Sequence, residues 1–102
     1  MPSVYYKKLV RDRIPEILDE KGISYEKHIA EDGEYRQALI EKLREEVGEF
    51  FESKSVEELA DVMEVIRALR RLPDFENAKE VQRAKREERG GFDEGIILIS
   101  GK

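Results

Sequence analysis

The sequence contains no cysteine and no tryptophan, and only one histidine among its 102 residues. Without cysteine, the chain can form no disulfide, and it offers neither a thiol nucleophile nor a thiolate ligand for a metal. The serines show no spacing typical of a nucleophile elbow or a catalytic triad, and His28 stands among charged neighbours, where we expect a surface position. These absences exclude thiol chemistry and leave covalent catalysis without support.

Long hydrophobic runs are also missing. No stretch approaches the roughly 18 consecutive apolar residues of a membrane-spanning helix. Residues 1–13 lack the apolar core of a signal peptide. We therefore expect a cytoplasmic protein that does not associate with membranes.

Charge is abundant but mixed in sign. Charged residues make up 42% of the chain, with 19 Lys and Arg against 24 Asp and Glu, for a net charge of -5. A net negative charge disfavours nucleic-acid binding, and Tyr5 and Tyr6 are not interleaved along a basic face. Apolar residues recur regularly through the charge, so the chain is expected to fold rather than remain disordered.

The length fits one small domain, covering residues 1–102. A chain of this size buries only about 60 to 65% of the surface that its unfolded form exposes. Association with a second copy would supply further burial, so we expect a homodimer or a higher homo-oligomer.

The pattern of apolar and capping residues predicts a mainly α fold. Helices are expected at residues 16–21, 34–53, 55–72 and 75–89. Short strands that pair with each other are expected at residues 23–29 and 95–100. The fold class is therefore an antiparallel helical hairpin or bundle with short terminal β segments.

The connection between the two longest predicted helices is very short. Ser53, Lys54 and Ser55 form it, and Ser55 with Glu58 matches the S-x-x-E pattern of a capping box. Such a brief link requires the two helices to run antiparallel.

Acidic residues lie at the margin of the apolar face on both of these helices. A projection at about 100° per residue places Glu46 and Glu49 beside the apolar face of the first helix. Glu58 and Asp61 hold the matching position on the second helix. In an antiparallel pair, the four carboxylates should converge on one groove.

The energetic cost of this convergence depends on burial. Two carboxylates about 5 Å apart repel by roughly 3 kcal/mol at an effective dielectric near 20, so four of them require cations to stay ionised together. Oxygen ligands favour Mg²⁺, or Mn²⁺, over zinc. Taken singly, each acid also fits a solvated helix surface, and Glu58 also fits the acceptor of the capping box.

Two basic segments could bind the phosphate oxygens of a substrate. Residues 7–13 form a dense basic cluster in a net-acidic chain, which favours a binding role for Arg11. Residues 85–92 form the second segment, where Lys85 also fits an ordinary basic helix end.

The paired acidic motifs resemble those of a known superfamily. Residues 42–49 read Lys-Leu-Arg-Glu-Glu-Val-Gly-Glu and residues 57–62 read Glu-Glu-Leu-Ala-Asp-Val. This order of E-E-x-x-E and E-x-x-D is similar to the signature of the MazG-like all-α NTP pyrophosphatases. Residues 6–15 and 89–92 resemble a subgroup of short members described as phosphoribosyl-ATP pyrophosphohydrolase-like or house-cleaning pyrophosphatases.

The resemblance implies an activity and a helical dimer or larger assembly. The activity is Mg²⁺-dependent hydrolysis of a nucleoside triphosphate between its α and β phosphorus atoms. The implied metal ligands are Glu46, Glu49, Glu58 and Asp61. Glu45 and Glu49 are the acids implied in catalysis, Glu45 as a residue that orients water. The implied phosphate contacts are Lys8, Arg11 and Arg89, and Lys85 completes the expected substrate-binding set.

Three functions remain open from the sequence. The preferred one is hydrolysis of damaged, modified or surplus nucleoside triphosphates to the monophosphate and pyrophosphate. The first alternative has the same chemistry with phosphoribosyl-ATP, in histidine biosynthesis, as the one substrate. The second alternative is a non-enzymatic helical dimerisation module whose acids form a solvated surface.

Overall fold

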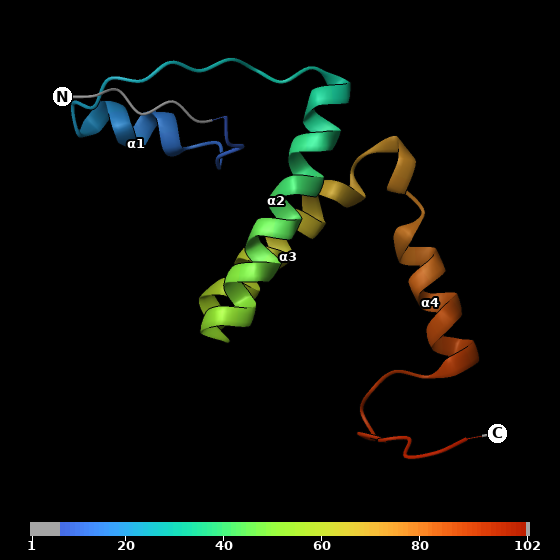
Figure 1. The fold of residues 1–102 in the computed structure, drawn as a ribbon. Helices are drawn as coiled ribbons and strands as arrows, with labels where there is room; N and C mark the ends of the chain where they lie inside the picture. The colour runs from blue at the N-terminus through green and yellow to red at the C-terminus, as the bar shows by residue number, and fades with distance from the viewer. Residues whose placement is uncertain (1–6, 102) are drawn as a thin grey trace. The chain divides into compact units, whose positions relative to one another are not determined.

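The computed structural model describes residues 7–101 and is mainly helical, as the sequence predicts (Figure 1). Its helices are α1 (Ile14–Glu20), α2 (Asp32–Ser53), α3 (Val56–Arg70), the 3-10 turn η1 (Pro73–Phe75) and α4 (Ala78–Arg89). The chain divides into two compact units, with the boundary between Leu69 and Arg70. The first unit holds α1, α2 and nearly all of α3, and the second holds η1 and α4.

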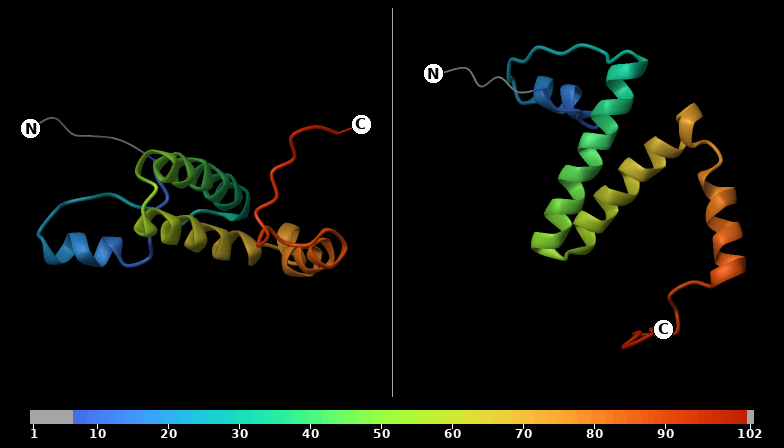
Figure 2. Two further views of the ribbon diagram at one scale, coloured as in Figure 1. Left: turned by 90° about the horizontal axis from the view of Figure 1, so that it is seen from below. Right: turned by 45° about the vertical axis from the view of Figure 1, so that its right-hand side comes forward.

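The turn between α2 and α3 is set by Lys54 and Ser55. Lys54 adopts a left-handed conformation, with φ at 50°, and its N–H donates to the carbonyl oxygen of Phe50 at 2.7 Å. Ser55 then starts α3, because its Oγ accepts the backbone N–H of Glu58 at 3.2 Å. Since only these two residues separate the helices, α2 and α3 leave the turn side by side and in opposite chain directions (Figure 2).

The buried core of the first unit lies between α2 and α3. Leu39 on α2 and Val65 on α3 are the buried apolar side chains among the described residues. Glu46 on α2 is as buried as Val65, with 8% of its surface exposed. Burial of a carboxylate to this extent costs free energy, because it removes water from the charged group. The fold therefore places an acid where apolar packing would be expected.

The two predicted strands are wrong in this structure. No strand occurs within residues 7–101, and both 23–29 and 95–100 lack regular secondary structure. Their apolar side chains face solvent, with Ile29 85% exposed and Ile99 93% exposed. A pattern of side chains shows only that a segment could form a strand, whereas a strand exists only when its main chain bonds to a neighbour.

The second unit is built around α4. The predicted helix 75–89 begins three residues later than expected, because Pro73–Phe75 first form the 3-10 turn η1. Gly90 ends α4 with φ at 82°, a conformation that glycine adopts without strain. No residue of α4 is buried. Among residues 7–101, no helix combines the length and the apolarity that a membrane span requires.

Candidate metal site

Three acidic side chains from α2 and α3 meet within the first unit. Glu46 comes from α2, and Glu58 and Asp61 come from the first two turns of α3. One carboxylate oxygen from each lies within 4.8 Å of the other two. Glu46 is buried, and the other two are half-buried. The cluster is therefore partly shielded from water rather than spread over an exposed surface.

The local hydrogen bonds leave the carboxylate of Glu58 available to this cluster. In a complete capping box, Glu58 would accept the backbone N–H of Ser55. Here that N–H donates to Ser53 Oγ at 3.3 Å instead. The Oε2 atoms of Glu58 and Glu46 are both buried without a hydrogen-bond partner. Two buried oxygens without a partner at one place form an arrangement that a bound cation would satisfy.

Burial raises the pKa of Glu58 to about 7, and three neighbouring acids add to the effect. Removal of water from the carboxylate is the largest cause of the raised pKa, followed by the closeness of the Glu46 carboxylate, which would hydrogen-bond a protonated Glu58. The negative charges of Glu49, Glu46 and Asp61 contribute further. Both kinds of cause penalise the ionised form, so the cluster holds a proton near neutral pH when no cation balances its charge.

This raised pKa predicts how stability depends on pH. Between about pH 4.5 and about pH 7 the folded protein binds a proton at Glu58 that the unfolded chain has released. Stability contributed by Glu58 should therefore fall as pH rises through this window. We expect the melting temperature of the chelator-treated protein, followed by circular dichroism, to decrease across it.

The matched variants Glu58→Gln and Glu57→Gln test this assignment, because both remove one acid from the first turn of α3. Glu58→Gln should flatten the pH dependence, whereas Glu57→Gln at the exposed neighbouring position should keep it. An unchanged slope in Glu58→Gln would contradict the origin assigned to it.

Glu49, the fourth predicted ligand, lies outside the group of three. It is exposed on α2, although its charge still raises the pKa of Glu58. The structure thus brings three of the four predicted acids within mutual reach of one small ion. Glu49 is close enough to act electrostatically, and its roles as ligand and catalytic acid stay predictions.

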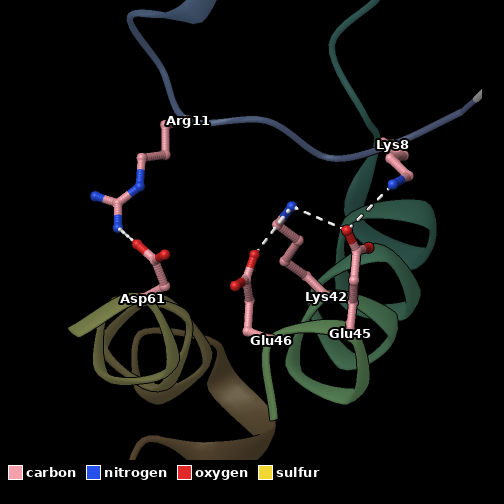
Figure 3. A network of polar contacts seen from close by, with 6 residues as sticks. All are labelled: Lys8, Arg11, Lys42, Glu45, Glu46 and Asp61. Carbon is pink, nitrogen blue, oxygen red and sulfur yellow. Dashed lines mark hydrogen bonds and ion pairs between the residues drawn. The ribbon is translucent and has the colours of Figure 1, made fainter. Parts of the chain in front are cut away.

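Two basic side chains from the segment before α1 contact the acids (Figure 3). Arg11 Nη2 lies 2.6 Å from Asp61 Oδ1. Lys8 Nζ lies 3.2 Å from Oε1 of Glu45, the other predicted catalytic acid. Both residues were expected to bind phosphate. The structure pairs Arg11 with an acid of the cluster and Lys8 with the neighbouring Glu45, and the role of both in phosphate binding stays a prediction.

Lys42 also belongs to this network, although the acidic motifs did not predict a role for it. Its Nζ lies 3.4 Å from Glu46 Oε1 and 3.7 Å from Glu45 Oε1 (Figure 3). The sequence does indicate these contacts, because Lys42 lies four residues before Glu46 and three residues before Glu45 on one helix. Its side chain is only 22% exposed, so the ammonium is part of the site.

The remaining predicted substrate contacts belong to the second unit. Lys85 and Arg89 are exposed on α4, and their neighbour Arg86 lies 3.8 Å from Asp93. Their role in phosphate binding stays a prediction. His28 is a surface residue as expected, with its Nε2 2.8 Å from Glu34 Oε2.

The donor set fits a hard divalent cation. All three clustered ligands are carboxylates, two have an orphaned buried oxygen, and no sulfur or imidazole donor contributes to the group. Lys42 and Arg11 balance part of the charge through Glu46 and Asp61.

Comparison with known proteins adds no assignment: no protein-family model matches the chain, and no curated protein or solved structure shows significant similarity to it.

Proposed function

We propose that the protein is a Mg²⁺-dependent nucleoside triphosphate pyrophosphohydrolase. The observation that carries the proposal is buried Glu46, whose Oε2 has no partner and whose carboxylate lies within 4.8 Å of those of Glu58 and Asp61. Cations on the neighbouring segment add a second feature that polyphosphate chemistry needs. The resemblance of the acidic motifs to the MazG-like superfamily supports the same function.

Glu46, Glu58 and Asp61 would hold the cation, with Glu49 as the further ligand that the motif implies. The bound ion would neutralise phosphate charge and lower the pKa of a coordinated water. Mn²⁺ is the expected substitute, because it accepts the same oxygen ligands.

Glu45 is the proposed residue for orienting or deprotonating the attacking water. Lys8 and Lys42 both contact its Oε1, at 3.2 and 3.7 Å, and Lys42 also contacts Glu46 of the cluster at 3.4 Å. A carboxylate held in this way can accept a proton from water as a general base. Addition of that water to the α phosphorus breaks the bond to the bridging oxygen, and the products are the nucleoside monophosphate and pyrophosphate.

Arg11 and Lys8 are the proposed phosphate contacts of the first unit, and phosphate binding by Lys85 and Arg89 stays a prediction from the sequence. Damaged, modified or surplus nucleotides are the proposed substrates, in a cytoplasmic setting. Phosphoribosyl-ATP as the one substrate is the alternative within the same chemistry.

A homodimer or a higher homo-oligomer is part of the proposal. Val56, Leu59, Met63 and Ile66 follow the three- and four-residue spacing of one helix face, and all are between 41 and 73% exposed. A second copy covering this face would complete a helical bundle from the α2–α3 hairpin. The same face is the observation that favours the non-enzymatic dimerisation module as the competing function.

The test is an assay of pyrophosphate release from a panel of standard and modified nucleoside triphosphates and from phosphoribosyl-ATP, with Mg²⁺ and with chelator. Turnover of several triphosphates that stops with chelator is the expected result. Exclusive turnover of phosphoribosyl-ATP would establish the narrower alternative. No turnover of any substrate, together with no Mg²⁺ or Mn²⁺ binding, would favour the association module.

A further inference from the structure

The guanidinium of Arg11 contacts the cluster at a single carboxylate. It lies 2.6 Å from Asp61 Oδ1 (Figure 3). Asp61 is one of the three acids whose oxygens lie within 4.8 Å of one another. Arg11 belongs to residues 7–11, which form no helix or strand. A positive side chain on an irregular segment therefore pairs with one of the two oxygens that Asp61 can offer to a cation.

We propose that Arg11 is a displaceable counter-ion, which holds Asp61 when the site contains no metal and leaves it when a divalent cation binds. This inference rests on the metal site of the proposed function and specifies how that site exchanges partners. Mg²⁺ binds carboxylate oxygens at about 2.0–2.1 Å, so a guanidinium on the same carboxylate competes with it for the negative charge of Asp61.

The exposure of the ion pair makes the exchange feasible. The Arg11 side chain is 59% exposed and that of Asp61 is 37% exposed, so solvent screens the attraction between them. Lys42 differs from Arg11 in exposure and in its place in the chain. Its side chain is 22% exposed, and it lies on the same helix as its partner Glu46. Arg11 is thus the cation that can leave, and Lys42 is the cation that stays.

The displaced guanidinium would remain tethered within reach of the cluster through residues 7–13. Next to a metal-bound polyphosphate, its planar donors match phosphate oxygens. Metal binding would then convert Arg11 from a partner of Asp61 into a substrate contact. This exchange predicts ordered binding, in which the metal precedes the nucleotide at the site.

Thermodynamic linkage relates the affinity of the metal to the strength of the Arg11–Asp61 contact. If Arg11 weakens metal binding by some factor, then bound metal weakens the Arg11–Asp61 contact by the same factor. The loss of a half-exposed ion pair of this kind changes the equilibrium constant of a competing binding step by about two- to fivefold. Arg11→Gln should therefore bind Mn²⁺ about two- to fivefold more tightly than the wild type, as measured by isothermal titration calorimetry without nucleotide.

Arg13→Gln is the matched control. It removes the same charge two residues away, but Arg13 pairs with Glu16 at 3.2 Å rather than with the cluster. Its Mn²⁺ affinity should equal that of the wild type. Equal affinities in Arg11→Gln and Arg13→Gln would overturn the proposal and leave the metal site intact. Absence of Mn²⁺ binding in all three proteins would overturn the metal site itself.

A second measurement follows the side chain directly. The Nε–Hε NMR resonance of Arg11, assigned from its loss in Arg11→Gln, should shift during a Mg²⁺ titration with the same midpoint as the amide resonances of α3. The resonance of Arg13 should stay in place. An Arg11 resonance that does not move when the α3 amides saturate would show that Arg11 keeps its partner, which contradicts the exchange.

Discussion

Asp61→Asn is expected to reduce nucleotide turnover by at least about 100-fold in kcat/KM, without destabilising the metal-free protein. Loss of a group that merely supports a metal ligand commonly costs 10- to about 100-fold in affinity or activity, and loss of a ligand should cost more. The measurement is initial-rate pyrophosphate release at saturating Mg²⁺.

The stability of the metal-free Asp61→Asn variant distinguishes a metal-ligand role of Asp61 from a structural role. The substitution removes the ion pair with Arg11, which is half-exposed and therefore worth at most about 1 kcal/mol. It also removes a negative charge that contributes to the raised pKa of Glu58. These effects oppose each other, so the melting temperature in chelator should change little or rise.

Glu64→Gln is the control for Asp61→Asn. Glu64 is an exposed acid one turn further along α3 and pairs with Arg67 at 3.5 Å. Its substitution should leave both turnover and melting temperature near the wild-type values. A large loss of metal-free stability in Asp61→Asn would argue against crowded acids that repel each other.

Mg²⁺ is expected to raise the melting temperature strongly. At a free concentration about 100 times the Kd, a ligand specific for the folded state stabilises it by about 2.7 kcal/mol. For a domain of about 100 residues, each kcal/mol moves the melting temperature by about 4–8 °C. We therefore expect a shift on the order of 10 °C or more, measured by circular dichroism against a potassium salt of equal ionic strength.

Glu46→Gln should remove most of this shift. Glu46 is the most buried acid of the cluster, and its Oε2 has no other partner. The amide keeps the size of the side chain but donates hydrogen bonds and carries no charge, so the affinity for a divalent cation falls. Glu41→Gln on the exposed side of α2 should keep the full shift. An equal shift in Glu46→Gln and the wild type would place the stabilising ion elsewhere.

Local signals in the sequence predicted the helices well. Pro15 at the start of α1, Gly22 beyond its end, and the Ser55 cap of α3 each act within a few residues of the chain. The placement of Glu46 and Asp61 followed from helical periodicity once the short turn at Lys54 required antiparallel helices.

Predictions that needed a partner distant in sequence were less successful. Residues 23–29 and 95–100 have the composition of strands, but a strand needs a paired main chain, and neither segment forms one. The sequence allowed Glu58 to accept the N–H of Ser55, but in the structure Ser53 Oγ accepts it.

The sequence by itself determined which segments form helices, with ends that differ by up to three residues, and which acids share a helix face, because these properties depend on contacts three or four residues apart. Only the tertiary structure decided that Glu46 is buried, that three acids rather than four come together, and that Arg11 contacts Asp61 across fifty residues. Burial and long-range ion pairs depend on how separate segments pack, and that packing sets which carboxylates lose water and which cations reach them.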